Sequence, residues 1–171
     1  MPAQGADQFM DFFNHISYVR EKRGVYFASP HACFPPLIYF MYGLFSRILP
    51  RDATAMYSTE ATSTHALLLY VVYCVLLAVC FFYSVCRMLK NRTMEFSLAA
   101  AVTVLMSYAF IFGVTERGNS VMIVCILLLL ALELRDGNDA MHRELALLLI
   151  AAAAGIKIYP AVFGVLYLFE K

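Results

Sequence analysis

Residues 151–160 read Ala-Ala-Ala-Ala-Gly-Ile-Lys-Ile-Tyr-Pro and lie in an apolar run, 145–169, whose only charged residue is Lys157. A lone ammonium within such a run costs about 2.5–3.5 kcal/mol on membrane-insertion scales, so it normally faces a bundle interior or a watery cavity. Gly155 and Pro160 flank Lys157, and both residue types weaken or break a helix. Because an interrupted helix is tolerated at membrane depth only where it lines protein or a cavity, this stretch predicts a polar site in a membrane protein.

The composition of the whole chain agrees with that prediction. Of its 171 residues, 62% are hydrophobic and 15% are charged, whereas soluble domains average about 45–50% apolar and 25% charged residues. The net charge of +1 says nothing about nucleic acid, but no basic stripe interleaved with aromatic residues occurs, so we expect no nucleic-acid partner. The five cysteines form no C-x-x-C pair and have no histidine at zinc spacing, so we expect no metal site.

We predict that residues 1–63 form an external loop with two short juxtamembrane helices. The first helix lies within 1–23, where apolar residues recur with helical spacing, and the segment Gly24-Val25-Tyr26 ends it. The second, Leu37–Leu49, starts after Pro35-Pro36 and is about 20 Å long. Since about 30 Å is needed to cross the hydrocarbon core, we expect the first helix to lie on the membrane surface and the second to lie in the interface or to be partly inserted.

Residues 64–171 predict transmembrane helices at about 64–86, 95–114, 119–134, 144–157 and 160–170. The final run has two interpretations: one helix kinked at Pro160, or two half-length helices that dip into the membrane and return. The cations in 87–92 and 135–144 place both loops in the cytoplasm, which puts 1–63 and the turn 115–120 outside. The expected fold class is therefore all-α, a polytopic membrane helical bundle.

Three polar clusters collect on the predicted outer side. They are Asp11 with Asn14 and His15, then Glu116 with Arg117 and Asn119, then Lys157 with Tyr159. A carboxylate beside cations suits the deprotonation of a sugar hydroxyl while the cations stabilise a phosphate leaving group.

Each of these residues also has a structural interpretation. Asp11 could lie on a solvated helix face, Arg117 could be an interfacial anchor, and Lys157 could pair with Glu116. His15 and His31 could be hydrogen-bonding surface residues.

Five motifs, in this order, together resemble glycosyltransferase family 87 of the GT-C superfamily of polytopic membrane enzymes. They are Asp11-Phe12-Phe13-Asn14, Gly24-Val25-Tyr26, Phe34-Pro35-Pro36-Leu37, Glu116-Arg117-Gly118-Asn119 and Lys157-Ile158-Tyr159-Pro160. The resemblance implies a sugar donor on a polyprenyl phosphate and a lipid-linked or cell-surface glycan acceptor. It also implies Asp11 as the general base and a lipid entrance shaped by the Pro35-Pro36 helix. Asp7, four residues before Asp11, is the alternative base, and we prefer Asp11 because it stands in the motif.

The resemblance implies that Arg117 and Lys157 hold the donor phosphate. We add Asn14, His15, Glu116, Asn119 and Tyr159 as candidate substrate-binding residues. Such enzymes have a helix before the aspartate loop and further helices after the Lys-x-Tyr-Pro segment, so we expect this chain to be a fragment or a truncated form.

The function that we expect is an inverting membrane hexosyltransferase of the mannosyl type in the bacterial plasma membrane. We expect no cofactor, apart from weak assistance by a divalent cation. Two alternatives stay open at this point. One is a transporter or flippase of lipid-linked sugars, because discontinuous helices also mark transport sites; the other is a non-catalytic remnant of such an enzyme.

Overall fold

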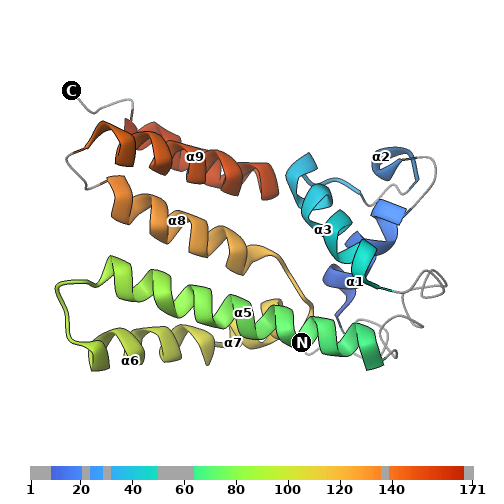
Figure 1. The fold of residues 1–171 in the computed structure, drawn as a ribbon, viewed down its shortest axis with the longest axis horizontal. Helices are drawn as coiled ribbons and strands as arrows, with labels where there is room; N and C mark the ends of the chain where they lie inside the picture. The colour runs from blue at the N-terminus through green and yellow to red at the C-terminus, as the bar shows by residue number, and fades with distance from the viewer. Residues whose placement is uncertain (1–8, 21–23, 29–31, 50–63, 136–138, 168–171) are drawn as a thin grey trace.

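Three long helices lie side by side in the computed structural model, which describes residues 9–20, 24–28, 32–49, 64–135 and 139–167. They are α5 (Thr64–Met88), α8 (Val121–Arg135) and α9 (Ala140–Ile156), with α8 packed between the other two (Figure 1). Every regular element in the described ranges is a helix. The expected all-helical class is therefore confirmed for this part of the chain.

One face of α5 is buried and the opposite face is an exposed apolar surface. Tyr70, Tyr73, Leu77 and Phe81 recur at helical spacing and are buried. The outward residues are large and apolar: Leu68, Val71, Val72, Val75, Leu76 and Val79. Among the described helices, α5 alone is long and apolar enough by itself to cross a membrane. A surface of this kind is the one that lipid would cover.

The segment expected as one helix over 95–114 is bent in the structure. It forms α6 (Met94–Leu105), α7 (Tyr108–Phe110) and a π-helix, η3 (Ile111–Glu116), with a bend of 56° at the break. The cause is local, because the Ser107 hydroxyl accepts a hydrogen bond from the Phe110 N–H at 3.2 Å and so starts a new helix. If this bent pair is one span, the described residues contain two candidate spans.

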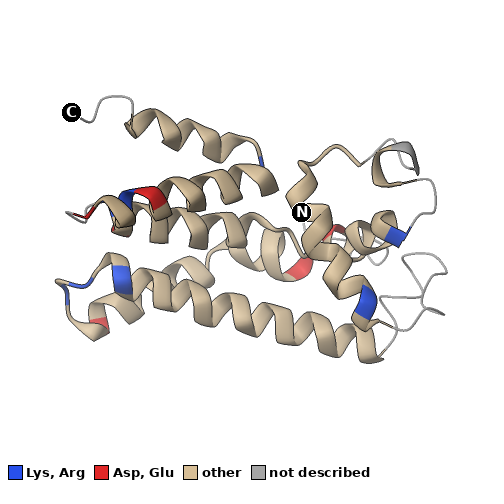
Figure 2. Cartoon of the chain, turned by 45° about the horizontal axis from the view of Figure 1, so that its top comes forward, with Lys and Arg blue, Asp and Glu red and all other residues tan. Residues whose placement is uncertain are grey.

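The final apolar run reverses direction at Lys157. Helix α9 begins at Ala140, earlier than the expected residue 144, because Asp139 caps its first turn through the Met141 N–H at 3.2 Å. Lys157 has extended backbone angles, and the 3₁₀ helix η4 (Tyr159–Tyr167) packs back along α9 (Figure 2). The structure thus has the returning arrangement rather than a single kinked helix.

The N-terminal helices gather at one end of the three long helices (Figure 1). They are α1 (Met10–Arg20), α2 (Val25–Ala28) and α3 (Pro36–Ile48). Helix α2 corrects the sequence prediction, which treated Gly24-Val25-Tyr26 only as the end of the first helix. Arg20 of α1 donates to the Ser46 carbonyl at 2.9 Å and to the Leu49 carbonyl at 3.3 Å, so it ties α1 to the C-terminal end of α3.

The charged residues of the long helices lie near the helix ends, and the middle of the bundle carries none (Figure 2). At the end away from α1, Glu133 of α8 pairs with Arg87 at 3.1 Å and with Lys90 at 3.6 Å. The C-terminal ends of α5 and α8 lie at this same end (Figure 1). The distribution agrees with two interfaces separated by an apolar layer, but the polytopic arrangement stays a prediction. Helices α8 and α9, about 22 and 26 Å long, are shorter than the hydrocarbon core.

Candidate functional site

The site begins where α1 meets the turn between η3 and α8. The first N–H groups of a helix have no partner within the helix, and here the turn supplies carbonyl groups. The Phe9 N–H donates to the Glu116 carbonyl at 2.6 Å, and the Asp11 N–H donates to the Arg117 carbonyl at 2.8 Å. Tyr70 of α5 holds the other side of the turn by donating to the Thr115 and Val114 carbonyls at 2.7 and 3.0 Å. The backbone carbonyls of the Glu-Arg-Gly-Asn motif therefore hold the N-terminus of α1 in place.

Gly118 is the residue of this motif that permits the contact. Its φ is +75°, a conformation that favours glycine. A β-carbon at this position would lie 2.6 Å from the Phe12 Cβ and 3.2 Å from a ring carbon of Tyr70. Any other residue would push α1 away from the turn.

Asp11 points its carboxylate at the turn, where two side chains bind it. Asn119 donates from Nδ2 to Oδ2 at 2.8 Å, and Arg117 Nη2 lies 3.5 Å from Oδ1. The Asn119 amide is held in this orientation, because its Oδ1 accepts the Val121 N–H at 3.1 Å and thereby caps α8. Arg117 is 47% exposed, so its charge can move toward a ligand while Asn119 keeps the carboxylate in place.

Lys157 approaches the same region from the break between α9 and η4. Its Nζ lies 4.7 Å from the centre of the Phe34 ring, within the range of a cation–π contact. Its charge also acts on Asp11 and His15. The alternative ion pair between Lys157 and Glu116 is absent from the described residues.

His15 lies one helical turn after Asp11 and is buried, with 6% of its surface exposed. Its Nδ1 contacts the Asp11 carbonyl, and its ring stacks on Tyr39 and Tyr42 with centroids 5.7 and 4.9 Å away. Burial lowers the pKa of His15, and the charge of Lys157 lowers it further, while Asp11 opposes the shift. The structural interpretation of His15 as a surface residue was wrong, because α3 covers it.

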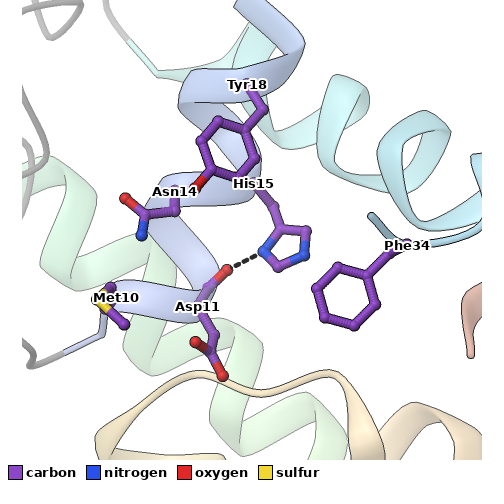
Figure 3. Close-up of a pocket in the computed structure, with 6 residues that line it drawn as sticks. All are labelled: Met10, Asp11, Asn14, His15, Tyr18 and Phe34. Atoms are coloured by element: carbon purple, nitrogen blue, oxygen red, sulfur yellow. Dashed lines mark hydrogen bonds between the residues drawn. The ribbon is translucent and has the colours of Figure 1, made fainter. Parts of the chain in front are cut away.

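A pocket of about 340 Å³ opens beside Asp11 and His15 (Figure 3). Its lining residues are Met10, Asp11, Asn14, His15, Tyr18 and Phe34. The volume lies near the lower end of the range for small-molecule sites, roughly 300–1,000 Å³. The pocket therefore suits a small polar ring flanked by aromatic groups better than an extended chain.

Two of the expected site residues lie elsewhere. The Glu116 side chain forms no hydrogen bond or ion pair in the described part of the chain, and the residue contributes its backbone carbonyl instead. Tyr159 is 53% exposed and lies near Cys125 of α8, away from the pocket lining. Asp7 and His31 lie outside the described residues. In the described ranges, no three His, Cys, Asp or Glu residues are grouped as metal ligands.

The sequence prediction missed the aromatic wall formed by Tyr18, Tyr39 and Tyr42, which surrounds His15. Tyr39 and Tyr42 recur three residues apart in the helix that follows Pro35-Pro36. This spacing signals one buried helix face, although it does not say what the face would cover.

In a comparison with protein-family models, residues 34–171 match the model of glycosyltransferase family 87. The matched range contains Phe34, the turn 116–119 and Lys157, and it begins after α1. Comparison with the curated proteins and with the solved structures gave no match.

Proposed function

Because the chain belongs to glycosyltransferase family 87, a family of membrane glycosyltransferases, we propose that it transfers a hexose of the mannosyl type from a polyprenyl-phosphate donor. The acceptor is a lipid-linked or cell-surface glycan at the outer face of the bacterial plasma membrane. The observation that carries this proposal is one carboxylate, Asp11, on the wall of a sugar-sized pocket with Arg117 and Lys157 beside it.

Asp11 has the geometry of a general base. Asn119 donates to Oδ2 at 2.8 Å, whereas Oδ1 has, among the residues that the structure describes, only the longer contact with Arg117. This second oxygen accepts the proton of an acceptor hydroxyl as the hydroxyl oxygen attacks the anomeric carbon. The new bond to carbon forms as the bond from that carbon to the phosphate oxygen breaks, with inversion at the carbon.

Arg117 and Lys157 stabilise the leaving group. The polyprenyl phosphate departs with the electron pair of the broken bond, and its negative charge grows where the two cations lie. Arg117 offers a planar fork for phosphate oxygens and Lys157 a point charge. The lipid tail of the donor runs along apolar surface such as the outward face of α5. This scheme uses no cofactor, and a divalent cation would give at most weak assistance.

The experiment compares Asp11→Asn with wild type in lipid nanodiscs that contain a polyprenyl-phosphate mannose donor and octyl α-mannoside as acceptor. Loss of a general base should lower kcat about 10²–10⁴-fold. The matched control is Asp139→Asn, because Asp139 caps α9 at the far end and asparagine caps equally well. Transfer by Asp11→Asn at the wild-type rate would remove Asp11 from this role.

The break at Lys157 also favours a second candidate, a transporter or flippase of lipid-linked sugars, since discontinuous helices bind substrates in transporters. A flippase would move the donor between leaflets without forming a glycosidic bond. Movement of the donor with no glycoside product would support this candidate, whereas a protein with neither activity would be the non-catalytic remnant.

A further inference from the structure

The inference starts from an unsatisfied atom of His15, a residue that lines the pocket. Nε2 of His15 is buried and has no hydrogen-bond partner among the described residues, and His15 itself is 94% buried. A buried polar atom without a partner keeps the full desolvation penalty of its burial, so such atoms in a native fold call for a physical reason. Nothing in the proposed chemistry of Asp11, Arg117 and Lys157 uses this nitrogen.

The chemical character of that nitrogen follows from the partner of the other one. Nδ1 contacts the backbone carbonyl of Asp11, and a carbonyl oxygen can only accept a hydrogen bond. Nδ1 therefore carries the hydrogen, and in the neutral ring Nε2 presents a lone pair. Burial and the Lys157 charge keep the ring neutral by lowering its pKa.

The ring is also held in place. It stacks between Tyr42 and Tyr39, with interplanar angles of 27° to both, and Phe34 lies 5.0 Å away. Asp11 and His15 are four residues apart on α1, so they share one face of the helix. Figure 3 shows the His15 ring between Asp11 and Phe34.

We propose that His15 Nε2 accepts a hydrogen bond from a hydroxyl of the acceptor sugar and so turns the reacting hydroxyl toward the Asp11 carboxylate. This inference rests on the proposed function and assigns the acceptor to this pocket. A hydroxyl fits better than an ammonium donor, because Lys157 already places a positive charge beside the ring. His15 then selects acceptors, because a site built to bind a hydroxyl rejects analogues that lack it.

The first test is independent of catalysis. Nitrogen NMR of the chain with ¹⁵N-labelled histidine, assigned by comparison with His15→Gln, reports which ring nitrogen carries the hydrogen. We expect a hydrogen on Nδ1 and a bare Nε2 at pH 7, and a shift of the Nε2 signal when methyl α-mannoside is added. A hydrogen on Nε2, or an Nε2 signal unchanged by saturating sugar, would overturn the inference.

The second test uses two variants, each of which keeps a polar atom near the position of one of the two ring nitrogens. His15→Asn retains a donor near the Nδ1 position but removes Nε2, whereas His15→Gln places an amide oxygen near the Nε2 position. We expect His15→Asn to lower kcat/KM for octyl α-mannoside about 10–200-fold, with the donor KM unchanged. His15→Gln should retain most of the activity.

A purely structural histidine would give a different pattern. His15→Gln loses the bond to the Asp11 carbonyl, so it would then be the more damaged variant, and that result would overturn the inference.

The pH profile adds a third readout, with Asp11, Lys157, Tyr18, Tyr39 and Tyr42 as the groups that face the ring. The acceptor KM of wild type should stay flat through the ordinary histidine pKa of 6.5 and rise only at lower pH, while that of His15→Gln stays flat throughout.

Failure of the inference and failure of the proposed function are distinguishable. If wild type transfers mannose but the two variants behave alike, His15 does not orient the acceptor. If wild type transfers nothing, the proposed function fails, and the nitrogen spectra still decide whether His15 Nε2 binds a sugar hydroxyl.

Discussion

Gly118 decides at the scale of one residue whether the site assembles. Gly118→Ala places a β-carbon 2.6 Å from the Phe12 Cβ and 3.1 Å from the Phe12 backbone nitrogen, at a residue with positive φ. Neither of these two atoms is the end of a flexible side chain, so neither can move aside easily. We expect the unfolding free energy to fall by about 1–3 kcal/mol, which lowers the melting temperature by roughly 2–12 °C for a chain of this size. Thermal unfolding in detergent measures this change.

Gly113→Ala is the matched control, because a β-carbon at Gly113 meets nothing within 4 Å. It should leave the melting temperature unchanged or raise it slightly. If the two alanine variants melt at the same temperature, α1 does not pack against the turn 116–119 in the way that the structure shows.

Residue patterns predicted some members of the site and not others, for a physical reason. Asp11, Asn119 and Arg117 stand in motifs whose chemistry is readable in the chain, and the structure brings them together. Tyr159 is two residues from Lys157, yet the extended backbone at Lys157 turns the following segment away from the pocket. Proximity in sequence therefore fails as a guide where the chain reverses.

At the scale of helices, the contact between α3 and α9 sets the position of Lys157 relative to Phe34. Gly155 of α9 lies under Leu37 of α3, and a β-carbon there would meet the Leu37 Cβ and Cδ2 at 3.1 Å. Gly155→Leu should push the start of α3 away and move Phe34 off the Lys157 ammonium. We expect transfer to fall by up to about 100-fold, the effect of a displacement of roughly 1 Å in a catalytic site, measured at saturating donor and acceptor.

The control for this prediction is Gly164→Leu on η4, where a β-carbon meets nothing within 4 Å. This variant should transfer sugar at the wild-type rate. Equal loss in both variants would mean that the spacing of α3 and α9 does not set the geometry of the site.

Helices were easier to predict than their contacts. The apolar length of α5 and the heptad-like spacing of Tyr70, Tyr73 and Leu77 are visible in the chain, so its existence and inner face could be inferred. The bend at Ser107 depends on a single hydroxyl that competes for a backbone N–H. The burial of His15 depends on how α3 packs against α1. This is a tertiary contact, and it cannot be predicted from the spacing of residues within α1.

At the scale of the whole molecule, the structure separates a basic end from the end that holds the site. The C-terminal ends of α5 and α8 share one end, where Glu133 pairs with Arg87 and Lys90. Asp11, Lys157 and Cys33 lie toward the other end, and Cys33 is an exposed free cysteine. If the basic end is cytoplasmic, as the positive-inside rule predicts, the pocket faces outward.

Thiol labelling in intact cells tests this orientation directly. In a chain whose only cysteine is Cys33, a membrane-impermeant maleimide should react without permeabilisation, because that thiol is exposed beside the site. In the matched chain with Cys33→Ser and Asn91→Cys, reaction should require permeabilised cells, because residue 91 lies in the loop after α5. Labelling of both cysteines in intact cells would place both ends of α5 on one side. An outward-facing transferase pocket above a cytoplasmic basic loop would then be impossible.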